Sequence, residues 1–86
     1  MENNVIRIVN RIIAEYFNNK REYLRIRSNM LWVHDNNPGY TLKQAFAYVM
    51  QGIIYMYDAK KDEYEPITNT LWQVLEGKNH SLTKLW

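Results

Sequence analysis

Apolar residues in the first third of the chain recur at alternating steps of four and three residues. This spacing places them along one stripe of an α-helix, and such a stripe needs a facing helix to cover it. Eight of nine positions are apolar and Asn19 is the polar one; the positions are Val5, Val9, Ile12, Tyr16, Asn19, Tyr23, Ile26, Met30 and Val33. The pattern predicts a long N-terminal helix and an all-α fold.

A strand within the same segment is the alternative. Asn18-Asn19 is a plausible helix stop, and Leu24, Ile26, Met30 and Trp32 alternate as in a half-buried strand, with Ser28 as the exception. The helix is favoured because its register continues from Val5 and because residues 20 to 27 are mostly good helix formers. An α+β fold with a strand near residues 23–33 stays open.

A second helix is predicted after the turn at Pro38-Gly39. Thr41 and Gln44 have the spacing of a capping box, which marks a helix start. The residues that follow are apolar nearly all round, so this helix is expected to be the most buried element. Gly52 in its interior predicts close helix packing or a break. A hairpin made by residues 53–57 and 64–67 is the alternative.

A short third helix is predicted towards the end of the chain. Pro66 is expected to end the preceding element, Thr68 or Asn69 to cap the helix, and Gly77 to stop it. Ser81 is a further candidate cap for a last turn. The prediction is therefore a single helical domain over residues 1–86, a small bundle of three or four helices.

Composition limits the class of protein. A chain of 86 residues with 47% hydrophobic residues is typical of one folded domain. The absence of cysteine suits a reducing compartment. A signal peptide is not expected, because Glu2 is acidic where basic charge is needed and Arg7 and Arg11 interrupt the apolar run. We therefore expect a cytoplasmic protein. The most apolar stretch, residues 45–57, is too short to span a membrane. Abundant asparagine, isoleucine and tyrosine hint at an AT-rich bacterial or phage genome.

Residues with catalytic or metal-binding potential are few and scattered. The two histidines, His34 and His80, fall in predicted loops without the spacing of a metal site. Ser28 and Ser81 have no local base or orienting acid, and the three glycines do not form a phosphate-binding loop. We therefore expect no enzyme activity, no cofactor and no metal.

Asn19 has two interpretations of equal weight. A polar residue in an apolar stripe can fix the register between two helices by pairing with its equivalent in a second copy. This interpretation predicts a homodimer formed through the first helix. Asn19 can equally be the point where the helix stops.

All five arginines lie in the first third of the chain, which carries six basic and three acidic residues up to position 34. On one continuous helix Arg7, Arg11, Arg21 and Arg25 would form a basic stripe opposite the core, and Arg27 lies nearby. Such a stripe fits a phosphate-binding helix, so a nucleic-acid-binding regulator is the alternative function. A solvated outer face is favoured over it because the net charge is only +2.

Aromatic residues suggest the leading function. Tyr and Trp are enriched in the hot spots of protein interfaces, and four such residues fall in predicted loops or at element edges: Tyr40, Tyr64, Trp72 and Trp86. With Asn19 they are the predicted interface residues. The sequence thus favours a non-enzymatic protein–protein interaction module, such as a small regulator or inhibitor that docks on a larger protein.

Overall fold

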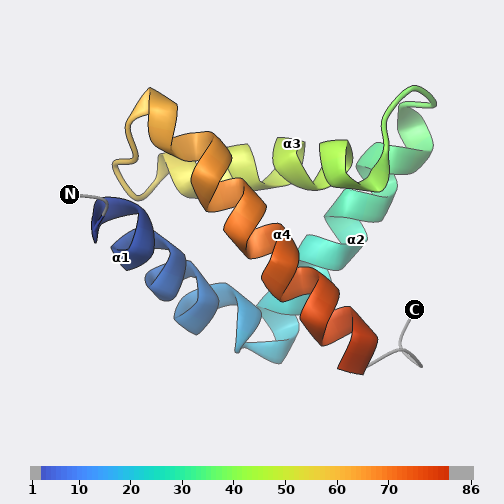
Figure 1. The fold of residues 1–86 in the computed structure, drawn as a ribbon. Coiled ribbons are helices and arrows are strands. Elements are labelled where there is room, and N and C mark those ends of the chain that lie inside the picture. The colour runs from blue at the N-terminus through green and yellow to red at the C-terminus, as the bar shows by residue number, and fades with distance from the viewer. Residues whose placement is uncertain (1–2, 82–86) are drawn as a thin grey trace.

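The computed structural model describes residues 3–81, and these form a small bundle of four α-helices without a strand. The helices are α1 (Asn3–Ile12), α2 (Lys20–Asn36), α3 (Leu42–Tyr55) and α4 (Tyr64–Ser81), with a π-helical turn η1 (Ile13–Phe17) after α1 and a 3-10 turn η2 (Lys61–Glu63) before α4 (Figure 1). The predicted all-α class is confirmed. The segment considered as a strand, residues 23–33, lies within α2.

The single long N-terminal helix is wrong, because the chain breaks at Asn18-Asn19. Asn19 has an extended backbone with φ −105° and ψ 112°, and its side chain accepts a hydrogen bond from the Glu22 backbone N–H at 3.2 Å. Asparagine favours this N-cap role because its side-chain oxygen replaces a missing helix acceptor. The helix-stop interpretation of Asn19 is therefore confirmed, and α1 and α2 diverge as two arms (Figure 1).

The wide turn η1 changes which residue faces the core. The backbone N–H of Asn18 donates to the carbonyl of Ile13 at 2.8 Å, a bond that spans five residues instead of four. As a result Phe17 is buried at 2% exposure, while Tyr16, at the predicted position, is only half-buried. The predicted stripe holds on both sides of the turn; its buried members are Val9, Ile12, Tyr23, Ile26, Met30 and Val33.

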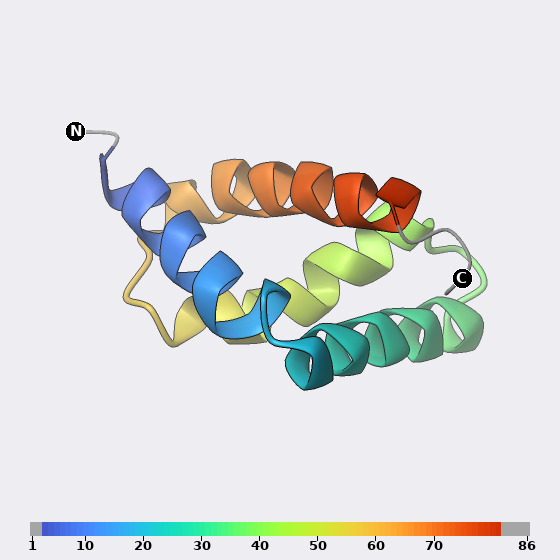
Figure 2. The same ribbon diagram turned by 90° about the horizontal axis from the view of Figure 1, so that it is seen from below.

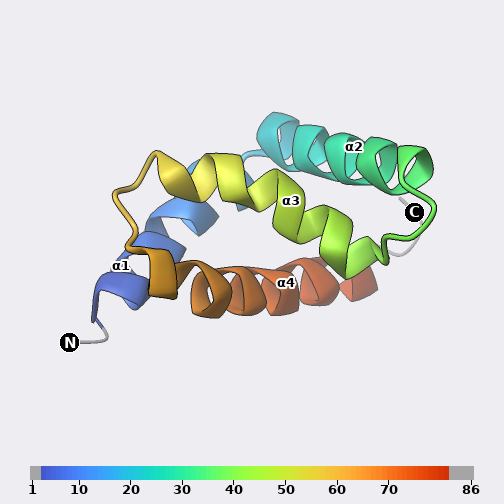
Figure 3. The same ribbon diagram turned by 90° about the horizontal axis from the view of Figure 1, so that it is seen from above.

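Helix α3 passes between α2 and α4, and α1 lies beside the first half of α4 (Figure 3). Figure 2 shows the same arrangement from the other side, with α2 and α4 flanking α3. The predicted capping box forms: the Gln44 N–H donates to the Thr41 hydroxyl at 3.1 Å, and the Thr41 N–H donates to the Gln44 side chain at 2.8 Å. The start of the second helix is thus where the sequence placed it.

The second helix, expected to be the most buried element, is central in the bundle but is buried on one side only. Its buried residues are Ala45, Phe46, Met50 and Ile54, and these lie on one side of the helix. The helix also continues through Gly52 without a break and without close packing, because nothing lies within 4 Å of the position a Cβ would take there. One long face of α3 is left for solvent.

Helix α4 is longer than predicted. It begins at Tyr64, includes Pro66 in its first turn and continues through Gly77 to Ser81. Proline is tolerated there because the first backbone N–H groups of a helix have no intrahelical acceptor. Thr68 is therefore a buried residue within the helix instead of its cap, and residues 64–67, considered as a hairpin strand, are helical.

Aromatic rings join the elements in the core. Phe46 of α3 lies with its ring centroid 6.5 Å from that of Phe17 and 5.3 Å from that of Trp72 on α4. Phe17 in turn lies 6.1 Å from Tyr23 on α2. Such pairs contribute about 0.5–1.5 kcal/mol each beyond their burial. The π-helical turn is thereby fixed to the other helices through Phe17.

Candidate protein-binding surface

The outward side of α3 carries two tyrosines and two glutamines in one row. We call this row the α3 face; its members are Gln44, Tyr48, Gln51 and Tyr55. Their steps of four, three and four residues keep them on one stripe of the helix. Tyr48 is 59% exposed and Tyr55 is 76% exposed, so both rings are available to a partner.

The α3 face carries no charge, and Lys43 is the one charged residue in the whole helix. Protein surfaces usually mix large exposed rings with charged side chains, whereas the centres of interfaces are poor in charge and rich in tyrosine and tryptophan. The α3 face has the composition of an interface centre.

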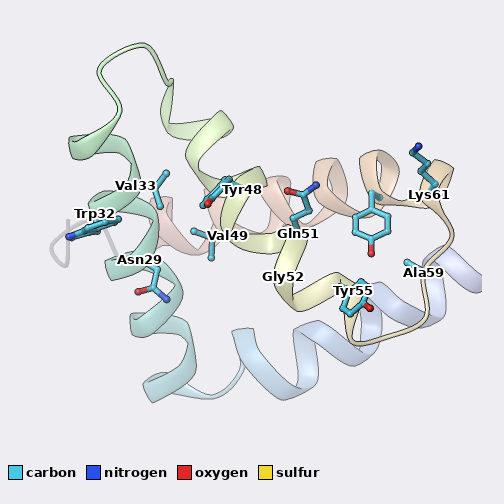
Figure 4. Close-up of a pocket in the computed structure, with 11 residues that line it drawn as sticks. Asn29, Trp32, Val33, Tyr48, Val49, Gln51, Gly52, Tyr55, Ala59 and Lys61 are labelled. Carbon is cyan, nitrogen blue, oxygen red and sulfur yellow. The ribbon is translucent and has the colours of Figure 1, made fainter.

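A groove of about 970 Å³ separates the α3 face from α2 (Figure 4). Trp32 of α2, which is 66% exposed, lines one side, and Tyr48 and Tyr55 line the other. Gly52 lies between the two tyrosines along α3, and Lys61 is the charged residue among those lining the groove. The groove is therefore mostly apolar and contains no carboxylate.

A second groove of about 700 Å³ lies between α3 and α4. It is lined by Tyr40 and by Thr68, and it shares Tyr48, Gln51 and Tyr64 with the first groove. The α3 face is consequently a ridge with a hollow on each side. Another helix can pack against a ridge between two hollows, because neighbouring helices place the ridges of one into the grooves of the other.

Two of the predicted interface residues lie at these grooves. Tyr40 is 38% exposed and lines the second groove, and Tyr64 lines both. Trp72 is partly buried against Phe46 and belongs to the core, while Asn19 caps α2 and lines a separate polar hollow. Trp86 lies outside the described residues.

Sequence reasoning missed the most exposed members of this surface: Trp32, Tyr48, Gln51 and Tyr55. The sequence contained a signal for this row. Tyr48 and Tyr55 are seven residues apart, and so are Gln44 and Gln51, which is the spacing of residues on one helix face. This second heptad row was overlooked because the helix was expected to be the most buried element.

The five arginines do not form one straight stripe. Arg7 and Arg11 lie on α1, and the bend at Asn18-Asn19 separates them from Arg21, Arg25 and Arg27 on α2 (Figure 1). Arg11 is 3.3 Å from the Glu15 carboxylate, and Arg25 is 3.5 Å from that of Glu22. The charge of these two guanidinium groups is therefore partly balanced within the chain.

A polar cluster connects the end of α1 to the end of α3. The Tyr57 hydroxyl donates to Glu15, and the Arg11 guanidinium lies 5.1 Å from the centre of the Tyr57 ring. The Tyr57 hydrogen bond, with help from Arg11, lowers the pKa of Glu15. Burial and the same hydrogen bond raise the pKa of Tyr57. These contacts hold two elements together, and Glu15 also lines the polar hollow of about 500 Å³ that borders Asn19, Glu22 and Arg25.

Metal-binding side chains are dispersed over the described residues. No three His, Cys, Asp or Glu side chains of that part of the chain lie close enough together to hold a metal ion. His34 pairs with its neighbour Asp35 at 3.6 Å on the surface. Between residues 3 and 81, none of the helices has both the length and the apolar composition required to cross a membrane.

Comparison of the chain with protein-family models, with curated proteins and with solved structures finds no match. The proposal about function therefore rests on the α3 face and its two grooves.

Proposed function

We propose that this protein is a non-enzymatic interaction module of the cytoplasm that binds another protein through the α3 face and its two grooves. The observation that carries the proposal is the pair of strongly exposed tyrosines, Tyr48 and Tyr55, on a helix face without charge. A chain of this size that docks on a larger protein would act as a small regulator or inhibitor.

The exposed rings supply enough surface for a binding centre. A buried aromatic side chain removes roughly 150–250 Å² from water, so Trp32, Tyr48 and Tyr55 at 66%, 59% and 76% exposure offer roughly 400 Å² together. A standard interface buries about 800 Å² on each partner. These three rings would therefore form about half of such an interface.

The test is affinity capture from the native host, followed by measurement of the affinity for the captured protein by titration calorimetry. The variant is the double substitution Tyr48→Ala and Tyr55→Ala, and the control is Ile6→Ala, because Ile6 is 56% exposed and lies on α1. Hot-spot residues lose about 2 kcal/mol or more on truncation, which is about 30-fold in affinity. Equal binding by the double variant and the wild type would contradict the proposal.

Nucleic-acid binding is the second candidate, and the observation in its favour is the exposed start of α2, where Lys20, Arg21 and Arg25 cluster. Binding to duplex DNA would weaken steeply with added salt because phosphate contacts release counterions. Substituting the arginines would abolish it; these are Arg7, Arg11, Arg21, Arg25 and Arg27. An absence of binding at low salt would eliminate this function.

A further inference from the structure

We infer that Met56 is a site of reversible oxidation by peroxides, at which the thioether becomes a sulfoxide while the protein stays folded. This inference goes beyond the proposed function, because it concerns a chemical modification and involves no partner protein. It rests on the exposure of three methionines, on the absence of cysteine and on the place of Met56 at the end of α3.

The methionines of the described chain lie in two different environments. Met30 on α2 is 1% exposed and Met50 on α3 is 0% exposed, and both belong to the hydrophobic core cluster. Met56 is 71% exposed and follows directly after α3 ends at Tyr55. A peroxide in solution therefore reaches the side chain of Met56 directly, whereas it reaches the other two only when the fold opens.

The composition of the chain directs oxidation to the thioethers. The sulfur atoms of cysteine and methionine are common targets of oxidants in proteins, and this chain has no cysteine and four methionines. Because no thiol competes for the oxidant, an accessible thioether is expected to react first. Met1 lies outside the described residues, so Met56 is the exposed methionine of the part that the structure describes.

The reaction transfers one oxygen atom and two electrons. A lone pair of the Met56 sulfur attacks an oxygen of hydrogen peroxide, so an S–O bond forms and the O–O bond breaks. The proton of the attacked hydroxyl passes to the departing hydroxide, which leaves as water. Sulfur is oxidised and the peroxide is reduced. A methionine sulfoxide reductase reverses the change, because a dithiol is oxidised to a disulfide and the oxygen leaves as water.

The position of Met56 allows the fold to tolerate a sulfoxide. Met56 is the C-cap of α3, and its backbone N–H donates to the carbonyl of Ile53 at 3.1 Å. This contact uses the backbone alone, so a polar group on the exposed side chain leaves it intact. A sulfoxide at Met30 or Met50 would instead place a polar oxygen in the apolar core, which is unfavourable. Among the described methionines, Met56 is thus the one at which oxidation is compatible with the folded state.

The first experiment treats the folded full chain with hydrogen peroxide and follows the added mass of about 16 Da per oxygen in tryptic peptides over time. Met50 and Met56 share the peptide 44–60, so fragmentation of that peptide assigns the oxygen, while Met30 lies in the peptide 28–43. Met56 should react at least about tenfold faster than Met30 and Met50, because a buried sulfur reacts only in opened states. Equal rates at the three positions in the folded chain overturn the inference.

Two controls separate the effect of the fold from the chemistry of the thioether. In concentrated urea the three methionines should react at similar rates, because the protection of Met30 and Met50 is lost with the fold. A preference for Met56 that persists in urea overturns the assignment to exposure. Met56→Leu is the matched variant, because leucine is similar in size and has no sulfur, and it should abolish the fast addition of oxygen to peptide 44–60. Addition to this peptide at the wild-type rate in Met56→Leu would show that another residue is the site.

A third measurement tests whether the protein stays folded and whether the change is reversible. Circular dichroism of the oxidised chain should show the helical signal of the untreated chain. Treatment with a methionine sulfoxide reductase and dithiothreitol should then remove the added oxygen. Loss of the helical signal in step with oxidation of Met56 overturns the inference, and so does oxygen that the reductase does not remove.

Discussion

Replacing Gly52 with alanine should stabilise the folded monomer. Glycine in the interior of a helix costs about 0.8–1.0 kcal/mol relative to alanine, because the glycine backbone loses more conformational freedom on folding. The penalty is recovered in full only if the new methyl group meets no obstacle. No neighbouring atom lies within 4 Å of its position, and α3 is regular through this residue.

The expected gain is therefore about 0.8–1.0 kcal/mol, which corresponds to a rise in Tm of about 3–8 °C for a domain of this size. Circular dichroism at 222 nm during heating measures it. Gly77→Ala is the matched control, because Gly77 also lies inside a helix and also has open space around it, but is far from the α3 face.

The two substitutions should give similar gains, because both glycines lie inside a helix with open space at the Cβ position. A fall in Tm for Gly52→Ala would refute the reasoning, because it would require a close neighbour within the chain itself.

Three further predictions concern the elements that hold the fold. Asn19→Ala removes the cap of α2 and should lower the free energy of unfolding by about 1 kcal/mol in urea titration. Phe46→Ala removes the ring at the centre of the core, which is 0% exposed, and should cost about 3–5 kcal/mol. Because the folded-state pKa of Glu15 is lowered, its contribution to stability is present above the unfolded value of 4.5 and is lost as the pH falls below it. Tyr57→Phe should make this acid loss smaller, as measured by Tm between pH 3 and pH 7.

Each of these predictions has a contradicting result. An unchanged midpoint for Asn19→Ala would mean that the Glu22 N–H has another acceptor. A loss below 1 kcal/mol for Phe46→Ala would mean that the surrounding rings collapse into its space. The same acid profile for Tyr57→Phe as for the wild type would show that the hydroxyl does not stabilise the Glu15 carboxylate.

The sequence predicted the helical class because buried stripes follow the helix period almost everywhere. The capping box at Thr41 and Gln44 located the start of α3 through local hydrogen bonds alone. The break at Asn18-Asn19 was visible only as an alternative, since the apolar period continues across it. The shift from Tyr16 to Phe17 could not be foreseen, because a π-helical turn depends on how the rings of Phe46 and Tyr23 accept the extra residue.

The candidate surface was predictable only in part. Tyr40 and Tyr64 were named because they border a turn and a helix start, and both line grooves. Trp72 was assigned to the surface because it fell at the edge of a short predicted helix, but it lies inside the longer α4 and its ring packs against Phe46. Tyr48 and Tyr55 were not singled out, because their helix was expected to be the most buried element. Helix α3 is flanked by α2 and α4 and keeps one side uncovered, and this number of neighbours is a tertiary property.

The wide turn at residues 13–17 makes the length of this segment more important than the identity of its residues. Each residue of an α-helix turns the chain by about 100°, so the deletion of one residue here would convert the turn to regular helix and rotate everything after it by that angle. Phe17 would then leave its place against Phe46 and Tyr23 in the core. We therefore expect an insertion or deletion at this point to disrupt the packing of the core, whereas substitutions on the exposed side of the same turn should leave the core intact.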